Sequence, residues 1–129
     1  MKKVEAIIAP SKLDAVRDSL RTRGVEGLSV SEVGGCGHEA GRVGYYRGSP
    51  YDMDFHPKLK LEIVAQDEDA IPTAYVIRDA ARAGRIGDGK IIILAVEDAI
   101  RVRTGEHGLR AIDDREVELP VERRWAAVG

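Results

Sequence analysis

The chain has 129 residues, of which 43% are hydrophobic and 33% charged, and its formal net charge is −2. This length allows one domain with a single core, and the absence of a basic surplus argues against a general nucleic-acid binder. A single cysteine, Cys36, excludes an internal disulfide, and no apolar run is long enough to insert into a membrane. We therefore expect one cytoplasmic domain.

The first third of the chain predicts a strand, a helix and a second strand. Alternate apolar residues over Val4–Ile8 indicate a strand with one better-buried face. Ser11 stands where it can cap a helix with apolar positions at 13, 16 and 20, and Gly24 would end that helix. The second strand is expected over about residues 28–33, with a bulge between its two valines because the alternation shifts there.

The remainder predicts a long loop and a second strand–helix–strand unit. Glycines and prolines over residues 34–57 exclude a continuous helix or a central strand, and a loop of about twenty residues is usually functional or disordered. Alternation over residues 58–65 indicates a strand with one wet face, and residues 91–96 form an apolar strand. Asp69 would cap the helix between them. The expected buried stripe of that helix is Ile71, Ala74, Ile77 and Ala81.

The order of these elements is β-α-β, long loop, β-α-β, which is typical of an α+β domain with the split βαβ topology. Two helices would cover one face of a four-stranded sheet. The other face requires a covering partner, and a neighbouring subunit is a good candidate.

A glycine-rich turn and two later arginines predict a binding site. The glycines of Gly84–Lys90 let the backbone approach a ligand closely, and Lys90 adds a fixed positive charge. If the segment that follows is extended, Arg101 and Arg103 lie on one face of it. Backbone amides together with three cations predict a site for a polyphosphate.

These two motifs, Gly-Arg-Ile-Gly-Asp-Gly-Lys-Ile at 84–91 and Arg-Val-Arg-Thr-Gly-Glu at 101–106, make the chain similar to the PII nitrogen-regulatory signalling proteins. The resemblance extends from residue 1 to about Ile112. It implies a compact homotrimer of ferredoxin-like subunits that holds ATP or ADP in the clefts between neighbours. Residues 1–112 would form this domain, and residues 37–55 would be its T-loop, the arm that docks into target proteins.

The resemblance also implies a role for individual residues. Phosphates would be held by the amides of residues 87–89 and by Lys90, and two arginines would reach them from the adjacent subunit. No residue is placed as a base or nucleophile, so the chain is read as a regulator and not an enzyme. The residues expected at the nucleotide are Ser29, Gly37, His38, Glu62, Val64, Gly87, Asp88, Gly89, Lys90, Arg101 and Arg103.

The effector site departs from the family pattern at one position. Typical members hold 2-oxoglutarate with Mg²⁺, a loop glutamine and a lysine; Lys58 matches the lysine, but Glu39 replaces the glutamine. A carboxylate is still an oxygen ligand for Mg²⁺, yet it repels a dicarboxylate bound to the same metal. Two interpretations stay open: weakened 2-oxoglutarate binding, or an atypical paralogue that senses adenine nucleotides with another co-ligand such as bicarbonate, linked to carbon metabolism or transport.

The loop tip and the C-terminal end carry the remaining predictions. Tyr51 aligns with a tyrosine that relatives have uridylylated, and Ser49 aligns with a serine that is phosphorylated in others. Arg47 matches the arginine that enters the pore of ammonium-channel partners, so a regulated enzyme or a membrane transporter is the expected partner. Residues 113–129 lie beyond the usual end of the family, and Val117, Leu119 and Val121 alternate there with polar residues. This segment is either an extra edge strand that covers the cleft, with Trp125 as its anchor, or a disordered tail.

Overall fold

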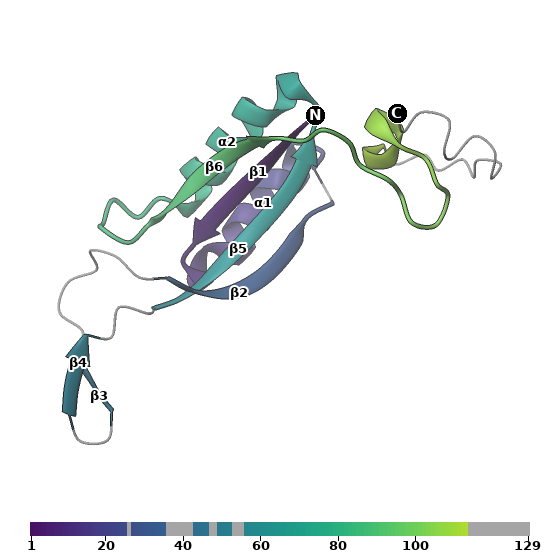
Figure 1. Cartoon of the computed structure of the whole chain (residues 1–129). Coiled ribbons are helices and arrows are strands. Elements are labelled where there is room, and N and C mark those ends of the chain that lie inside the picture. Colours follow the sequence, from purple (N-terminus) through teal and green to yellow (C-terminus); the bar gives the residue numbers. More distant parts are fainter. Residues whose placement is uncertain (26, 36–42, 47–48, 53–55, 114–129) are drawn as a thin grey trace.

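The computed structural model describes residues 1–25, 27–35, 43–46, 49–52 and 56–113 (Figure 1). In chain order the elements are β1 (Lys2–Ile8), η1 (Pro10–Lys12), α1 (Leu13–Thr22), β2 (Ser29–Gly35), β3 (Val43–Tyr46), β4 (Ser49–Asp52), β5 (His56–Ala65), α2 (Asp67–Ala81), β6 (Gly89–Ala95) and η2 (Gly108–Ile112).

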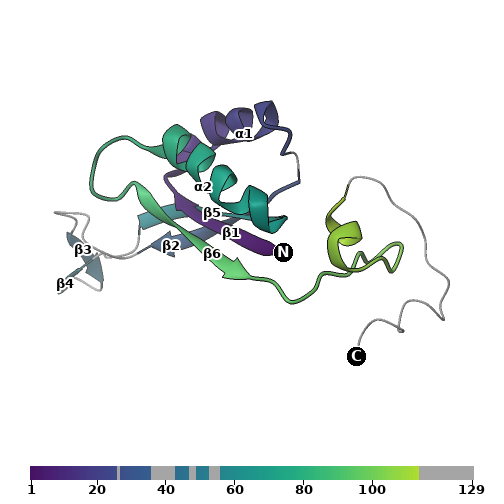
Figure 2. The same ribbon diagram turned by 90° about the horizontal axis from the view of Figure 1, so that it is seen from above.

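Four strands form one antiparallel sheet in the order β2-β5-β1-β6. The two helices lie together on one side of it, so the domain has two layers (Figure 2). The predicted α+β class and split βαβ topology are confirmed. None of the described helices combines the length and the apolar character needed to cross a membrane.

The core lies between the sheet and the helices. Val4, Ala6 and Ile8 of β1 are buried as predicted, because the pleat turns every second side chain toward the helices. The register places Val4 between Ile63 of β5 and Ile93 of β6, so three strands contribute to one layer. From the helices and β5 the buried apolar residues are Val16, Leu20, Leu59, Leu61, Ile63, Ala70, Ala74, Ile77 and Ala81.

The predicted stripe of α2 is wrong at one position. Ile71 is 54% exposed, whereas Ala70 and Thr73 are buried. At 100° per residue, Ile71 lies about 90° from the centre of the stripe that Ala74 and Ile77 define. The helix also begins earlier than predicted: its N-cap is Gln66, and Asp69 lies in the first turn.

Two further local predictions are wrong and one is confirmed. Every residue of β2 pairs with one residue of β5, so there is no bulge; Val30 and Val33 simply point to opposite faces of an edge strand. Ser11 does not cap α1, because the 3-10 turn η1 precedes the helix and makes Lys12 its N-cap. Gly24 ends α1 with φ +90°, and its amide donates to the carbonyl of Arg21 at 2.9 Å.

The segment predicted as an irregular loop contains a hairpin. β3 and β4 pair as a separate two-stranded sheet, from Val43 opposite Asp52 to Tyr46 opposite Ser49. The sequence carried no signal for these two short strands, because glycine and proline are unfavourable in strands.

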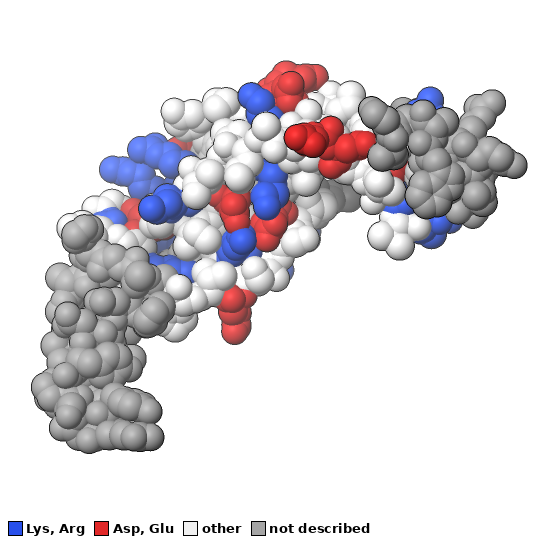
Figure 3. Space-filling model, in the orientation of Figure 1, with Lys and Arg blue, Asp and Glu red and all other residues white. Residues whose placement is uncertain are grey.

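Charged side chains meet on the open face of the sheet, the face away from the helices (Figure 3). Lys60 Nζ lies 2.6 Å from Glu5 Oε1 and 3.7 Å from Glu62 Oε1, and Lys3 Nζ lies 3.1 Å from Glu62 Oε2. Glu5 raises the pKa of Lys60, chiefly through its hydrogen bond. Ile7, Ile92 and Leu94 alternate onto the same face from β1 and β6.

We expect Gly89→Ala to destabilise the fold by at least about 3 kcal/mol. A Cβ at this position would lie 1.7 Å from the carbonyl oxygen of Ile7, and the backbone has φ +110°. Gly27→Ala is the control, since its Cβ would meet nothing within 4 Å. Urea unfolding of both variants measures the difference; equal stability would contradict the close contact between β6 and β1.

Candidate functional site

The glycine-rich turn precedes β6 and depends on left-handed backbone. Gly84, Gly87 and Gly89 have φ +81°, +98° and +110°, a region that only glycine enters readily. The glycines of the motif are therefore required by the path of the chain, whether or not a ligand approaches them.

Asp88 holds this turn together through its side chain. One carboxylate oxygen, Oδ2, accepts hydrogen bonds from the amides of Ala83, Gly84 and Arg85 at 3.0, 2.8 and 3.3 Å. These bonds, with that from Ala83 first, hold the pKa of Asp88 below its ordinary value. Its own amide donates to the carbonyl of Arg85 at 3.3 Å, so the turn already uses one of the amides predicted for phosphate.

Two lysines lie at the same end of the sheet as this turn. Lys58 Nζ donates to the carbonyl of Gly87 at 2.6 Å, which joins the predicted effector lysine to the glycine turn. Lys90 is exposed at the start of β6, opposite Ile7. Asp88, Gly89 and Lys90 line a crevice of about 520 Å³.

The segment of Arg101 and Arg103 is not extended, so the predicted shared face is wrong. Residues 102–104 form a turn: the amide of Gly105 donates to the carbonyl of Arg101 at 2.9 Å, and Gly105 has φ +77°. The amide of Arg101 donates to the carbonyl of Glu106 at 2.8 Å, which closes the loop. Only glycine at 105 allows so tight a return.

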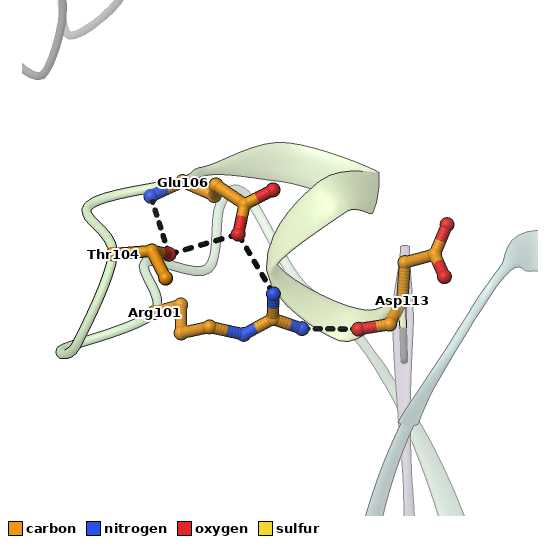
Figure 4. A network of polar contacts seen from close by, with 4 residues as sticks. All are labelled: Arg101, Thr104, Glu106 and Asp113. Carbon is orange, nitrogen blue, oxygen red and sulfur yellow. Dashed lines mark hydrogen bonds and ion pairs between the residues drawn. The ribbon is translucent and has the colours of Figure 1, made fainter. Parts of the chain in front are cut away.

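The buried carboxylate of Glu106 orients Arg101, and this role was not predicted from the sequence (Figure 4). Arg101 Nη1 lies 2.8 Å from Glu106 Oε1, and the Thr104 hydroxyl donates to the same oxygen at 2.9 Å. The side chain of Glu106 is 2% exposed and that of Arg101 is 14% exposed. Nη2 of Arg101 donates to the carbonyl of Asp113. An acidic residue five positions after an arginine, across a glycine, was the available signal.

Four of the residues predicted at the nucleotide line a second crevice, of about 510 Å³. Ser29, Glu62, Val64 and Arg101 all line it. Ser29 pairs with Glu62 across β2 and β5, which explains why residues far apart in sequence meet there. The hydrogen bond from Lys3 is the main cause that lowers the pKa of Glu62, so the carboxylate in this crevice is ionised and paired with Lys3 and Lys60.

The glycine turn with Lys90 and the turn with Arg101 lie at opposite ends of the sheet, although the first crevice extends along α2 and β6 as far as Ile71 and Ile93. Lys90 begins β6 beside Ile7, whereas Arg101 follows the far end of the strand, where Ala95 pairs with Lys2. Five residue steps of strand separate Lys90 from Ala95, about 17 Å. The two crevices have no lining residue in common. The structure therefore divides the predicted site into two half-sites.

Several predicted residues cannot be placed at either half-site. Gly37, His38, Glu39 and Arg47 lie outside the described residues, and Ser49 and Tyr51 lie on β4. Within the described part of the chain, no group of three or more His, Cys, Asp or Glu side chains is arranged to hold a metal ion.

This architecture defines a class: a ferredoxin-like α+β domain with a glycine-rich turn at one end of its sheet and an arginine-bearing turn at the other. The family model for nitrogen regulatory protein P-II matches residues 1–106. The chain is 52% identical over 112 residues to the nitrogen regulatory protein P-II of Rhizobium meliloti (strain 1021) and 51% to that of Bradyrhizobium diazoefficiens. It is 49% identical to that of Rhodospirillum rubrum; each alignment covers 87% of this chain and the whole relative. The chain belongs to the P-II family of nitrogen regulatory proteins, which are signalling regulators and not enzymes.

We expect Glu106→Ala to lower the free energy of unfolding by about 3–5 kcal/mol, because it leaves the shielded guanidinium of Arg101 without its carboxylate. Glu97→Ala, on an exposed residue of the segment after β6, is the control and should change stability by less than about 0.5 kcal/mol. Thermal and urea unfolding compare the two; similar stabilities would mean that the ion pair is solvated.

The stabilising contribution of Asp88 should be lost in acid. Its folded-state pKa lies below the ordinary value, so the ionised carboxylate stabilises the fold above pH 3.8, and this contribution disappears as the pH falls through the lowered pKa. Unfolding free energies of the unmodified chain and Asp88→Asn should differ at about pH 6 and converge as the pH falls through the lowered pKa of Asp88. A difference that does not change with pH would rule out this role.

Proposed function

We propose that this chain is a P-II signalling protein that binds ATP or ADP between neighbouring subunits of a homotrimer and passes the nucleotide state to a partner protein. The observation that carries the proposal is the separation of the two half-sites. Both contain groups suited to a nucleotide, but they lie at opposite ends of one rigid sheet.

One chain is unable to enclose the ligand by itself. Three linked phosphates are shorter than the distance from Lys90 to the far end of β6. A second copy, turned so that its Arg101 end meets the Lys90 end of the first, would complete the site. Because such a contact joins two different surfaces, it forms a closed ring when the rotation closes, as in a trimer.

The residues suggest how the two half-sites share the nucleotide. Lys90 and the glycine turn offer positive charge and backbone donors to phosphates, and Lys58, the residue expected at the effector, contacts the same turn. The other crevice offers Ser29 and the carboxylate of Glu62, which suit ribose hydroxyls, and the half-exposed Val64 beside the base. Arg101 and Arg103 would reach the phosphates from this second side, where a planar guanidinium binds two oxygens at once.

The open face of the sheet supports the same assembly. The exposed side chains of Ile92 and Leu94 form an apolar strip beside Ile7, and the ion pairs of Lys60 and Lys3 lie next to it. A subunit interface that covers this face would contain both the apolar strip and the ion pairs. The sheet would then face the trimer axis and leave the helices in solvent.

The output of the sensor is assigned to residues 37–55. The β3–β4 hairpin lies within this segment and outside the four-stranded sheet, so it is available to dock on a regulated enzyme or a transporter such as an ammonium channel. Arg47 as a docking residue, and Tyr51 and Ser49 as modification sites, remain predictions.

A second candidate function differs in the co-ligand. Glu39 stands where the family has a glutamine, and its charge opposes 2-oxoglutarate on a shared Mg²⁺. A sensor of adenine nucleotides with bicarbonate, linked to carbon metabolism or transport, would tolerate that charge better. Calorimetric titration of 2-oxoglutarate into the Mg²⁺–ATP form separates the two, since tight binding would exclude the second.

Mixed trimers test whether the site is shared between subunits. Lys90→Ala and Arg103→Ala should each abolish ATP binding, because each removes a phosphate contact from every site. When the two variants are unfolded together and refolded as mixed trimers, about one quarter of the sites should combine an intact Lys90 half with an intact Arg103 half and regain binding.

The control pairs Lys90→Ala with the double variant Lys90→Ala, Arg103→Ala. No subunit of this mixture carries Lys90, so no mixed trimer completes a site, and binding should stay absent. Calorimetry on both mixtures measures the recovered sites. Equal behaviour of the two mixtures would show that the site does not form across a subunit boundary.

A further inference from the structure

A groove of about 470 Å³, lined by four apolar and two basic residues, lies between α1 and β2. Its apolar lining includes Val30, which is 44% exposed although it belongs to the helix-facing side of the sheet. The residues that line the groove are Leu13, Arg17, Arg21, Val25, Leu28 and Val30. The groove thus combines a hydrophobic floor with two basic side chains.

The groove runs beside an open sheet edge. Within the described part of the chain β2 pairs only with β5, so the other side of β2 presents a row of unpaired backbone groups. An apolar groove beside a free edge is the arrangement that accepts an extended segment as an added strand.

We propose that the segment 117–121 of the same chain occupies this groove and adds a strand to the free edge of β2. The last described residue, Asp113, does not line the groove itself but lines two neighbouring crevices. It shares one with Leu28 and the other with Val25, and both of these residues also line the groove. Arg101 donates to the carbonyl of Asp113 and holds this starting point in place (Figure 4).

The length and direction of the segment fit this position. Residues 114–116 reach about 10 Å when extended, and Asp113 lines the same crevice as Ser29, the first residue of β2. β2 begins at this end of the sheet and runs away from it toward β3 and β4 (Figure 1). The added strand would run parallel to β2.

The sequence of the segment has the pattern of an edge strand. Val117, Leu119 and Val121 alternate with polar residues, so one face is apolar and turns toward the groove. Pro120 lacks an amide hydrogen and is tolerated when its nitrogen faces solvent. That condition directs the backbone groups of the three apolar residues toward β2.

Charge favours the same docking. Residues 113–122 contain five acidic residues and one basic residue, Arg115. The groove is lined by Arg17 and Arg21, and Arg17 makes an exposed contact to Asp14 at 3.0 Å. The acidic segment and the basic rim are complementary.

A disulfide test asks whether Leu119 reaches Val30. In a Cys36→Ser background, Val30→Cys with Leu119→Cys should oxidise to an intramolecular disulfide that alters gel mobility without forming a dimer. The matched control is Ile92→Cys with Leu119→Cys, since Ile92 has the same 44% exposure but lies on β6 at the opposite edge of the sheet. Equal oxidation of both pairs, or a disulfide between chains, would overturn docking within one chain.

Amide exchange on the unmodified full chain gives a second measurement. The amides of Val117, Leu119 and Val121 should exchange roughly tenfold or more slowly than those of residues 126–128. Leu119→Asp should remove this protection, and Glu118→Gln, on the opposite face, should keep it. Unprotected amides in the unmodified chain would refute the proposal. Neither experiment needs nucleotide, so its failure would leave the proposed sensor function untouched.

Discussion

The antiparallel register of β6 on β1 is the constraint on which the rest of the structure depends. Gly89 pairs with Ile8 and Ala95 pairs with Lys2, so β6 follows the central strand over its whole length. The glycine turn before β6 and the arginine turn after it are thereby held at opposite ends of a rigid sheet. The contact is so close at Gly89 that no side chain fits against Ile7. The division of the ligand site into halves follows from this pairing.

Each half-site is organised by one carboxylate that does not need a ligand to act. Asp88 accepts hydrogen bonds from three backbone amides at the surface. Glu106 instead pairs with Arg101 from a buried position beside Thr104. The buried arrangement is costly to disturb, since a lone charge would remain in a poorly solvated place. Both turns are therefore shaped before binding, and preorganisation of this kind lowers the entropy lost when a ligand is fixed.

The open face has a different balance of forces. Its ion pairs, such as Lys60 with Glu5, lie beside the exposed apolar side chains of Ile92 and Leu94. In the proposed trimer these pairs would lose water, and covered pairs of this kind contribute more to the choice of register than to affinity. The apolar strip would supply the driving force, and the charges would set how the neighbouring sheets align.

Local patterns in the sequence were enough to predict the elements, the split βαβ order, the buried face of β1 and the glycine end of α1, because each depends on a few neighbouring residues. The family motifs likewise singled out Lys90 and Arg101 as residues expected at the nucleotide. Boundaries and caps were less predictable: Ile71 and Ser11 were misassigned because packing and a preceding 3-10 turn decided them. By itself the sequence determined which residues we propose as phosphate ligands. Only the tertiary structure decided that they stand apart and that Glu106 orients Arg101, because strand register and burial depend on contacts between distant parts of the chain.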